Sequence, residues 1–244
     1  MSQDKIIVSN WKMNLGIREA THLINSLKKI HYKDPKIKNI ICPQFLLIPL
    51  IKNLLKKSKI LLGGQDCHHD NKGAYTGDTS INLLKEFNCE YVIVGHSERR
   101  QYHNESDIIV RKKVDLALLE NIKPIICIGE LLKQRKSKQY PQIIKKQLEI
   151  CIPDNFNKVI IAYEPVWSIG TGLVPSLKEI EEIYQLTKIY LEKSKKIQDF
   201  NFLYGGSVNS KNFNEIMTNT NVNGVLIGGS SIRIDEIKKI LTTC

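Results

Sequence analysis

Residues 161–172 place a single carboxylate, Glu164, at the end of an apolar run and directly before a proline and a small-residue loop. Apolar surroundings can keep a carboxylate poorly solvated and therefore basic. Pro165 stiffens the exit from the run, and the glycines of Gly170-Thr171-Gly172 let backbone N–H groups approach an anion or a moving lid. This combination suggests proton transfer on a small phosphorylated substrate.

Polar side chains also follow two other apolar runs. Asn10 and Lys12 come after the first run, and His96 lies between Gly95 and Ser97 after the fourth. A cation and hydrogen-bond donors can stabilise negative charge that develops on a substrate oxygen. Lys12 alone could be a surface charge, and His96 alone could be a packed histidine. Their positions at the ends of runs favour a site.

Glycine pairs follow the last two apolar runs, as Gly205-Gly206 and Gly228-Gly229. Each pair could be an ordinary turn. In eight-stranded α/β barrels, however, the loops after strands seven and eight frequently form a phosphate site. We therefore interpret both pairs as phosphate-binding loops.

The elements that must position these residues are short apolar runs alternating with longer amphipathic segments. The runs are residues 6–8, 37–42, 60–62, 91–94, 125–128, 159–162, 200–204 and 225–227. Helices are expected over, for example, 108–120, 140–150 and 177–193. The third would begin at the capping box Ser176-Leu177-Lys178-Glu179, and Asp235 could cap the last helix of the chain.

Eight strand–helix alternations with no visible linker predict an α/β fold, a single (β/α)8 barrel domain over residues 1–244. Parallel strands of such a barrel end at one rim, where active sites gather. That rim would bring Asn10, Lys12, His96 and Glu164 together.

Two further polar segments at strand ends have open roles. Glu98-Arg99-Arg100 can be interpreted as a mostly structural ion-pair run. Glu130, after the fifth run, is either a site residue or a buttress for Arg99.

The sequence Cys67-His68-His69-Asp70 resembles a metal-binding cluster. Adjacent ligands are expected to splay apart, and the sequence offers no partner cluster at metal-ligand spacing. We therefore expect no metal.

The composition limits the possible classes of function. The chain has 244 residues, a net charge of +11 and 42% hydrophobic residues. Its lysines are spread through the expected helices, which is typical of solvated helix faces and not of a nucleic-acid site, although positive potential attracts anionic substrates. No apolar run approaches the ~18 residues of a membrane span. Six cysteines without a Cys-x-x-Cys pair and no apparent signal peptide favour free thiols in a reducing cytoplasm.

Taken together in chain order, the motifs resemble those of the triosephosphate isomerase family over essentially the whole chain. The motifs are Asn10-Trp11-Lys12-Met13-Asn14, Gly73-Ala74-Tyr75-Thr76-Gly77-Asp78, Gly95-His96-Ser97-Glu98-Arg99-Arg100, Cys127-Ile128-Gly129-Glu130, Ala162-Tyr163-Glu164-Pro165-Val166-Trp167, Gly170-Thr171-Gly172 and Tyr204-Gly205-Gly206-Ser207-Val208. Ser168 and the second hinge of the lid, Leu173-Val174-Pro175, depart from the family pattern. Pro175 either restricts that hinge or merely leads into the next helix.

The resemblance implies interconversion of dihydroxyacetone phosphate and D-glyceraldehyde 3-phosphate through an enediolate, in glycolysis and gluconeogenesis. It implies that Glu164 is the general base, His96 a neutral electrophile, Lys12 the cation and Asn10 a side-chain donor. The reaction needs no cofactor and no metal.

The resemblance also implies that backbone N–H groups of Gly170, Ser207, Gly228 and Gly229 hold the substrate phosphate. It further implies a cytoplasmic homodimer in which the loop from Cys67 to Thr79 reaches the other subunit, with no nucleic-acid or membrane partner.

Two rival functions remain at this level. Another phosphate-binding barrel, such as a synthase of amino-acid biosynthesis, would share the glycine pairs but has no need for Asn10 and Lys12 together with His96 and Glu164. The other rival is a catalytically idle barrel that serves as a binding or adhesion protein. The complete catalytic set argues against the second rival without excluding an additional role.

Overall fold

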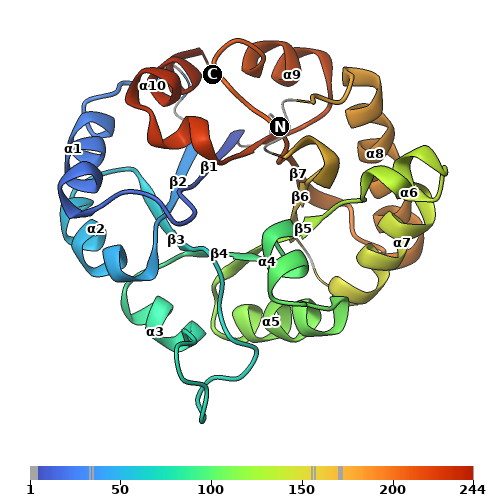
Figure 1. Cartoon of the computed structure of the whole chain (residues 1–244), viewed down its shortest axis with the longest axis horizontal. Coiled ribbons are helices and arrows are strands. Elements are labelled where there is room, and N and C mark those ends of the chain that lie inside the picture. The colour runs from blue at the N-terminus through green and yellow to red at the C-terminus, as the bar shows by residue number, and fades with distance from the viewer. Residues whose placement is uncertain are drawn as a thin grey trace.

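A computed structural model describes residues 5–32, 34, 36–154, 156, 158–169 and 173–243. Parallel strands pair in chain order, and the last pairs with the first, so that the sheet closes into a barrel (Figure 1). The strands are β1 Lys5–Asn10, β2 Ile37–Cys42, β3 Leu61–Gly64, β4 Tyr91–Val94, β5 Lys123–Ile128, β6 Lys158–Tyr163, β7 Asp199–Tyr204 and β8 Gly224–Ile227. The predicted (β/α)8 barrel is confirmed.

Helices form a ring around the barrel (Figure 1). They are α1 Ile17–Leu27, α2 Ile48–Leu54, α3 Ile81–Glu86, α4 Ser97–Tyr102, α5 Asp107–Leu119, α6 Leu132–Lys136, α7 Tyr140–Cys151, α8 Leu177–Tyr190, α9 Phe213–Asn219 and α10 Ile234–Thr243. The three helices named from the sequence are present. The third ends earlier as an α-helix and continues as a π-helical segment, Leu191–Lys195.

Of the two predicted helix starts, one is confirmed and one is wrong. The Ser176 hydroxyl accepts a hydrogen bond from the Glu179 N–H at 3.3 Å, and the Glu179 carboxylate accepts one from the Ser176 N–H at 2.8 Å. Asp235 does not precede the last helix, because α10 begins at Ile234. Its carboxylate instead lies in the first turn of α10, where its negative charge interacts favourably with the helix dipole.

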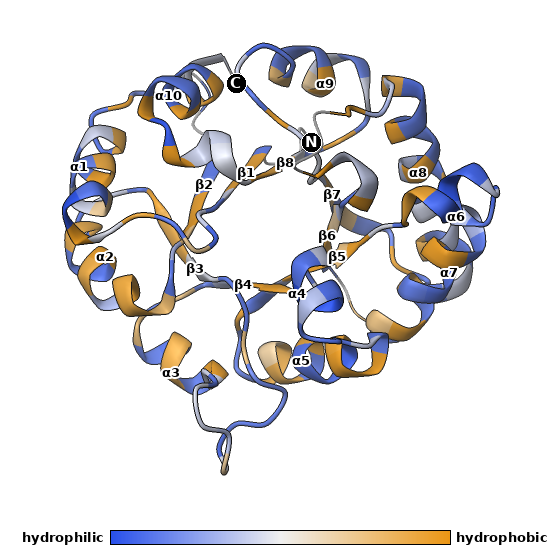
Figure 2. Cartoon of the chain, viewed as in Figure 1, coloured by the Kyte–Doolittle hydropathy of each residue, from blue (hydrophilic) through white to orange (hydrophobic). Residues whose placement is uncertain are grey.

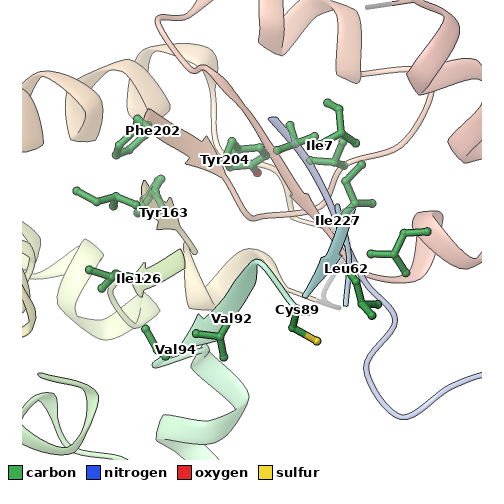
Figure 3. Close-up of a cluster of buried hydrophobic side chains, with 14 of the residues drawn as sticks. Ile7, Leu62, Cys89, Val92, Val94, Ile126, Tyr163, Phe202, Tyr204 and Ile227 are labelled. Carbon is green, nitrogen blue, oxygen red and sulfur yellow. The ribbon is translucent and has the colours of Figure 1, made fainter. Parts of the chain in front are cut away.

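Side chains of each strand point alternately into the barrel and out toward the helices. The buried outward side chains include Ile7, Val92, Ile126, Tyr163 and Phe202, which pack beneath the helix ring (Figure 3). The inward side chains include Val8, Ile40, Ile93, Ile125 and Leu203, which fill the barrel. Helix faces toward the barrel are apolar and outer faces are largely polar (Figure 2). Side chains that keep this inward direction just beyond the end of a strand therefore face a mouth of the barrel.

The segment between β3 and α3 extends beyond the helix ring as a long loop (Figure 1). Its base is closed by the His68 N–H, which donates to the Thr79 carbonyl at 2.8 Å. The Tyr75 ring lies 3.9 Å from the His68 ring, and its hydroxyl donates to Asp70 at 2.6 Å. The loop thus has its own internal contacts. No helix in the described ranges is long and apolar enough to cross a membrane.

Candidate active site

A cavity of about 500 Å³ opens at the carboxyl ends of the strands. The predicted site residues that line it are Asn10, Lys12, His96, Glu164, Ser207, Gly228 and Gly229. Barrel closure therefore brings together residues from β1, β4, β6, β7 and β8 that are far apart in sequence. Gly170, together with Thr171 and Gly172, lies outside the described residues.

Glu164 follows β6 directly and is almost completely buried. Its Oε2 accepts a hydrogen bond from the Ser97 N–H at 2.8 Å, and its Oε1 lies 2.9 Å from Nε2 of His96. Burial raises the pKa of Glu164, but His96, the Ser97 amide and Lys12 together lower it by more. The net downward direction keeps the carboxylate ionised at neutral pH, so that it can accept a proton.

His96 is the N-cap residue of α4, and its Nδ1 accepts the Glu98 backbone N–H at 3.2 Å. A backbone N–H can only donate, so Nδ1 must carry a lone pair and the proton must be on Nε2. Burial lowers the pKa of His96, whereas the Glu164 carboxylate raises it by more. The Nδ1 contact opposes that upward shift, because a second ring proton would face the Glu98 N–H. The geometry fits a neutral ring whose Nε2–H donates.

Lys12 adopts a left-handed backbone conformation, with φ of 51°, which is unusual for a residue with a long side chain. Two hydrogen bonds hold it there: the Asn10 amide oxygen accepts the Lys12 N–H at 3.0 Å, and Gln65 donates to the Lys12 carbonyl at 2.8 Å. The Asn10 amide oxygen is thereby occupied, which leaves its NH2 group as the donor toward the cavity.

The Lys12 ammonium group lies 2.5 Å from the Glu98 carboxylate, which also lines the cavity. Glu98, interpreted from the sequence as part of a mostly structural ion-pair run, thus forms an ion pair at the edge of the cavity. The two residues are 86 positions apart, and a surface-like Glu-Arg-Arg sequence carries no signal for that pairing. In the sequence, only the position of Glu98 two residues after His96 indicates that it lies near the site.

Residues that follow β7 and β8 form the wall of the cavity next to Lys12. Ser207, Gly228 and Gly229 line it, and a short 3-10 helix begins at Gly229. A Cβ atom at Gly228 would lie 3.2 Å from Cε of Lys12, so a larger residue would crowd the cation. A Cβ at Gly229 would meet nothing within 4 Å. This open, N–H-rich wall can accommodate an anion.

Glu130 does not buttress Arg99, contrary to one of the two roles considered from the sequence. Its Oε1 accepts hydrogen bonds from the Tyr163 hydroxyl at 3.1 Å and from Trp167 Nε1 at 3.0 Å. Glu130 is fully buried behind β6 and the segment that follows Glu164. It therefore anchors the base of the lid segment at Trp167.

Arg99 instead belongs to a buried charge cluster with Asp66, Glu105 and Lys113. The Arg99 guanidinium lies 2.8 Å from Asp66 and 2.5 Å from Glu105. Lys113 lies 2.7 Å from Asp66 and also pairs with Glu105. Burial is the main reason that the pKa of Asp66 is raised to about 6, whereas the pKa of Glu105 is lowered because both cations outweigh its burial. The cluster ties the ends of β3 and β4 to α5.

The ligand atoms of His68, His69 and Asp70 lie within 4.8 Å of one another, so the expectation that adjacent ligands splay apart is wrong here. His68 Nδ1 already accepts the Asp70 N–H at 3.0 Å, and the Asp70 carboxylate accepts the Tyr75 hydroxyl. These contacts give the cluster a role in shaping its loop. The expectation of no metal stays a prediction.

Comparisons with known proteins agree with this geometry. The family model described as triosephosphate isomerase matches residues 5–244. The chain is 40% identical over 244 residues to triosephosphate isomerase of Alkaliphilus oremlandii, covering 97% of this chain and 98% of that protein. It is 38% identical over 249 residues to triosephosphate isomerase of Buchnera aphidicola subsp. Baizongia pistaciae, covering 98% and 99%. It is 40% identical over 239 residues to the one of Dehalococcoides mccartyi, covering 96% and 94%.

Proposed function

The chain belongs to the triosephosphate isomerase family, and we propose that Glu164, His96, Lys12 and Asn10 carry its reaction. The enzyme interconverts dihydroxyacetone phosphate and D-glyceraldehyde 3-phosphate in glycolysis. The observation that supports the assignment is the contact of an ionised, buried carboxylate with the Nε2 side of a ring whose Nδ1 is occupied.

In the proposed mechanism, Glu164 takes a proton from C1 of dihydroxyacetone phosphate. The C1–H electron pair forms the C1–C2 double bond, and the carbonyl π pair moves onto O2 to give an enediolate. His96 Nε2–H and the Lys12 ammonium group stabilise the charge on oxygen, and His96 relays the proton from O1 to O2. Glu164 then returns its proton to C2, and the C1 aldehyde forms.

The substrate phosphate would lie against the backbone N–H groups of Ser207, Gly228 and Gly229, with Gly170 added from the lid. Lys12 lies between this wall and the reacting carbons, next to Gly228. Ser207 also donates its hydroxyl to the Ser168 carbonyl at 2.8 Å. That bond connects the phosphate wall to the base of the lid, so phosphate binding and lid position can be coupled.

The experiment that tests these roles is a coupled isomerase assay on the purified wild type and Glu164→Asp. Retracting the carboxylate by one methylene misplaces the base by on the order of 1 Å, which can lower the rate ~10²-fold. We expect normal folding by circular dichroism and a kcat lower by about that factor. The matched control is Glu149→Asp on the exposed face of α7, which should keep wild-type kinetics.

Near-native turnover of Glu164→Asp would remove Glu164 as the base. An inactive wild type would favour the catalytically idle barrel, and turnover of a different phosphorylated substrate would favour the other phosphate-binding barrel.

We also propose that the enzyme is a homodimer through the loop from Cys67 to Thr79. Met13 is 88% exposed and Leu46 is 94% exposed, which is unusual for large apolar side chains. With Gln44, Phe45 and Gln65 they line a hollow of about 210 Å³ beside the loop that carries Lys12. The protruding loop of a second copy fits this hollow, with Thr76 directed toward Asn10 of the first copy.

Light scattering tests the dimer. We expect a dimeric mass for the wild type and a monomer with reduced activity for Leu46→Asp, because a carboxylate would be buried unpaired at the interface. The control Leu119→Asp changes a comparably exposed leucine on α5 and should remain dimeric. A fully active wild-type monomer would contradict the proposal.

A cytoplasmic location and a role in gluconeogenesis complete the proposal. Burial raises the pKa of the free thiols of Cys42, Cys67, Cys89, Cys127 and Cys151. These side chains stay protonated and unreactive, which suits a reducing compartment. Cell fractionation with an antibody against the chain checks the location.

A further inference from the structure

The opposite mouth of the barrel, at the amino ends of the strands, contains a second hollow of about 550 Å³. Three pairs of residues that face each other in the strand register line it: Ile6 with Lys38, Tyr91 with Lys123, and Ile160 with Asn201. These pairs lie one level below the inward layer of apolar side chains that fills the barrel. The hollow therefore opens at the end of the barrel, between these strand residues and the neighbouring residues Leu118, Asn121, Ile122 and Phe156.

The walls of this hollow are apolar. Ile6, Tyr91 and Ile160 are buried residues of the strands. Ile122 and Phe156 extend the wall from the segments that precede β5 and β6. A hollow of this size, with apolar walls and few polar groups, has the dimensions of small-molecule sites.

One polar side chain lies deep in the wall. Asn201 is 3% exposed and lines the hollow. Its amide can donate a hydrogen bond to, or accept one from, a polar group of a ligand in the hollow. The asparagine stands on β7 in the same alternation as Leu203, so it points into the barrel.

The rim of the hollow is cationic. Lys38, Lys123 and Lys158 stand at or next to the first residue of β2, β5 and β6, on the inward-facing side of their strands. Lys123 lies 5.1 Å from the centre of the Tyr91 ring and 3.7 Å from Glu90. Lys158 lies 3.1 Å from Asp199, and all four of these charged side chains are about half exposed. Exposed pairs of this kind contribute little, so both lysines can turn toward an anion.

We propose that the amino-terminal mouth of the barrel binds a small amphipathic anion, with an apolar ring or branched chain in the hollow and one acidic group at the lysine rim. The apolar walls accept the body of the ligand, and Asn201 offers a hydrogen bond at depth. Carboxylate, sulfonate and phosphate groups share the required charge, but inorganic phosphate alone lacks the apolar body that the walls accept. The net charge of +11 adds a long-range attraction for any of them.

This site is separate from the catalytic cavity. The completely buried side chains of Val8, Ile40, Ile93 and Ile125 fill the barrel between the two mouths. A ligand at the amino-terminal mouth therefore leaves the substrate site open, and the two should bind independently.

The test uses naphthalene-2-sulfonate as the anionic probe and naphthalene-2-sulfonamide as its neutral match. Binding to the full chain is measured by calorimetry in excess inorganic phosphate, which occupies the substrate site. We expect the sulfonate to bind with phosphate present and the sulfonamide to bind about tenfold more weakly, because it lacks the charge-assisted contact.

The variant Lys123→Met/Lys158→Met removes two rim charges while keeping side-chain length. We expect it to lower sulfonate affinity about tenfold or more and to leave isomerase kinetics unchanged. The control Lys145→Met/Lys146→Met removes the same charge from the exposed face of α7 and should bind like the wild type. A second variant, Asn201→Leu, fills the hollow and should also weaken binding.

Four results would overturn the proposal: no sulfonate binding, displacement of the sulfonate by phosphate, unchanged affinity in the rim variant, or an equal loss in the control. The rim side chains are half exposed, so the rim variant remains informative even if Asn201→Leu does not fold.

Discussion

The two mouths of the barrel are made by the same eight strands but hold their charges in different ways. At the carboxyl end, Glu164 and His96 are buried and in mutual contact, and a buried cluster around Lys113 supports the rim from outside. At the amino end, Lys123 and Lys158 stand half exposed in pairs with neighbouring carboxylates. Because side chains alternate in direction along each strand, both mouths receive side chains that point into the barrel.

The difference arises from the connections. Segments after the strands cover polar side chains: β4 is followed by α4, which has His96 at its N-cap and whose Ser97 N–H donates to Glu164. These segments exclude water, which strengthens every charge interaction inside. At the amino-terminal mouth, the described residues leave the side chains of Lys123 and Lys158 about half exposed. The buried charged groups at the carboxyl end should therefore affect the free energy of unfolding and the reaction rate. The half-exposed lysines at the amino end should contribute little to either and can attract an anionic ligand.

The largest difference should appear when a lysine is removed from each end. Lys113→Met leaves the buried carboxylates of Asp66 and Glu105 with Arg99 as the one remaining cation of the cluster, which should lower the free energy of unfolding by about 3–5 kcal/mol. Lys158→Met breaks an exposed pair and should lower it by less than about 0.5 kcal/mol. Urea unfolding at one fixed protein concentration measures both. Similar losses at the two ends would mean that burial does not separate the mouths.

The next effect concerns catalysis. Lys12→Met keeps the side-chain volume, removes the cation and should lower kcat/KM by about 10²–10³-fold. Calorimetry should show weaker binding of a phosphate-bearing transition-state analogue. The matched control is Lys123→Met at the other mouth, which should retain wild-type kinetics. If the analogue binds the Lys12 variant with wild-type affinity, Lys12 does not stabilise the charge.

The buried cluster should also give the carboxyl end a pH dependence. Burial raises the pKa of Asp66 to about 6 from 3.8, so the folded protein keeps this proton where the unfolded chain has lost it. The contribution of Asp66 is therefore most favourable below about pH 4 and is lost as the pH rises to about 6.

Asp66→Asn lacks this titration, so its free energy of unfolding relative to wild type should increase by at most about 3 kcal/mol between about pH 4 and pH 7. Unfolding by urea at several pH values tests this at fixed protein concentration. Asp199→Asn changes a half-exposed carboxylate at the amino end and serves as the control. If the difference in the free energy of unfolding between Asp66→Asn and wild type stays constant across that pH range, Asp66 has the same pKa in the folded protein as in the unfolded chain.

The smallest effect is expected at Pro175. Its ring is buried, and it directly precedes the capping box at Ser176. This placement favours the interpretation that Pro175 leads into α8. Pro175→Ala should therefore lower stability by about 0.4–1 kcal/mol in a thermal melt while kcat and KM stay unchanged. A joint shift of kcat and KM would instead show that Pro175 restricts the lid hinge.

Much of the architecture could be predicted because its signals are local. The eight apolar runs fall on the eight strands, and β2 and β4 match their predicted bounds. The capping box at Ser176 needs only residues three apart. Asp235 shows the limit of such signals, since an acidic residue is favourable both at a cap and in the first turn.

The candidate site could be predicted for a similar reason. Each strand of the barrel ends at the same rim, so residues after the runs are neighbours whatever their separation in sequence. Asn10, Lys12, His96 and Glu164 were found in this way. Lys123 and Asn201 lie at or near the beginnings of β5 and β7, where the ends of the apolar runs give no signal.

The sequence by itself determined the strand and helix alternation and the rim on which the polar residues gather, because apolar runs and amphipathic segments are local patterns and the parallel strands of a barrel end at one rim. Only the tertiary structure decided the partners of the charged groups: Glu98 with Lys12, Glu130 with Trp167, and Asp66 with Lys113. Those pairs depend on barrel closure and on which segments exclude water. Neither leaves a repeating pattern in the chain.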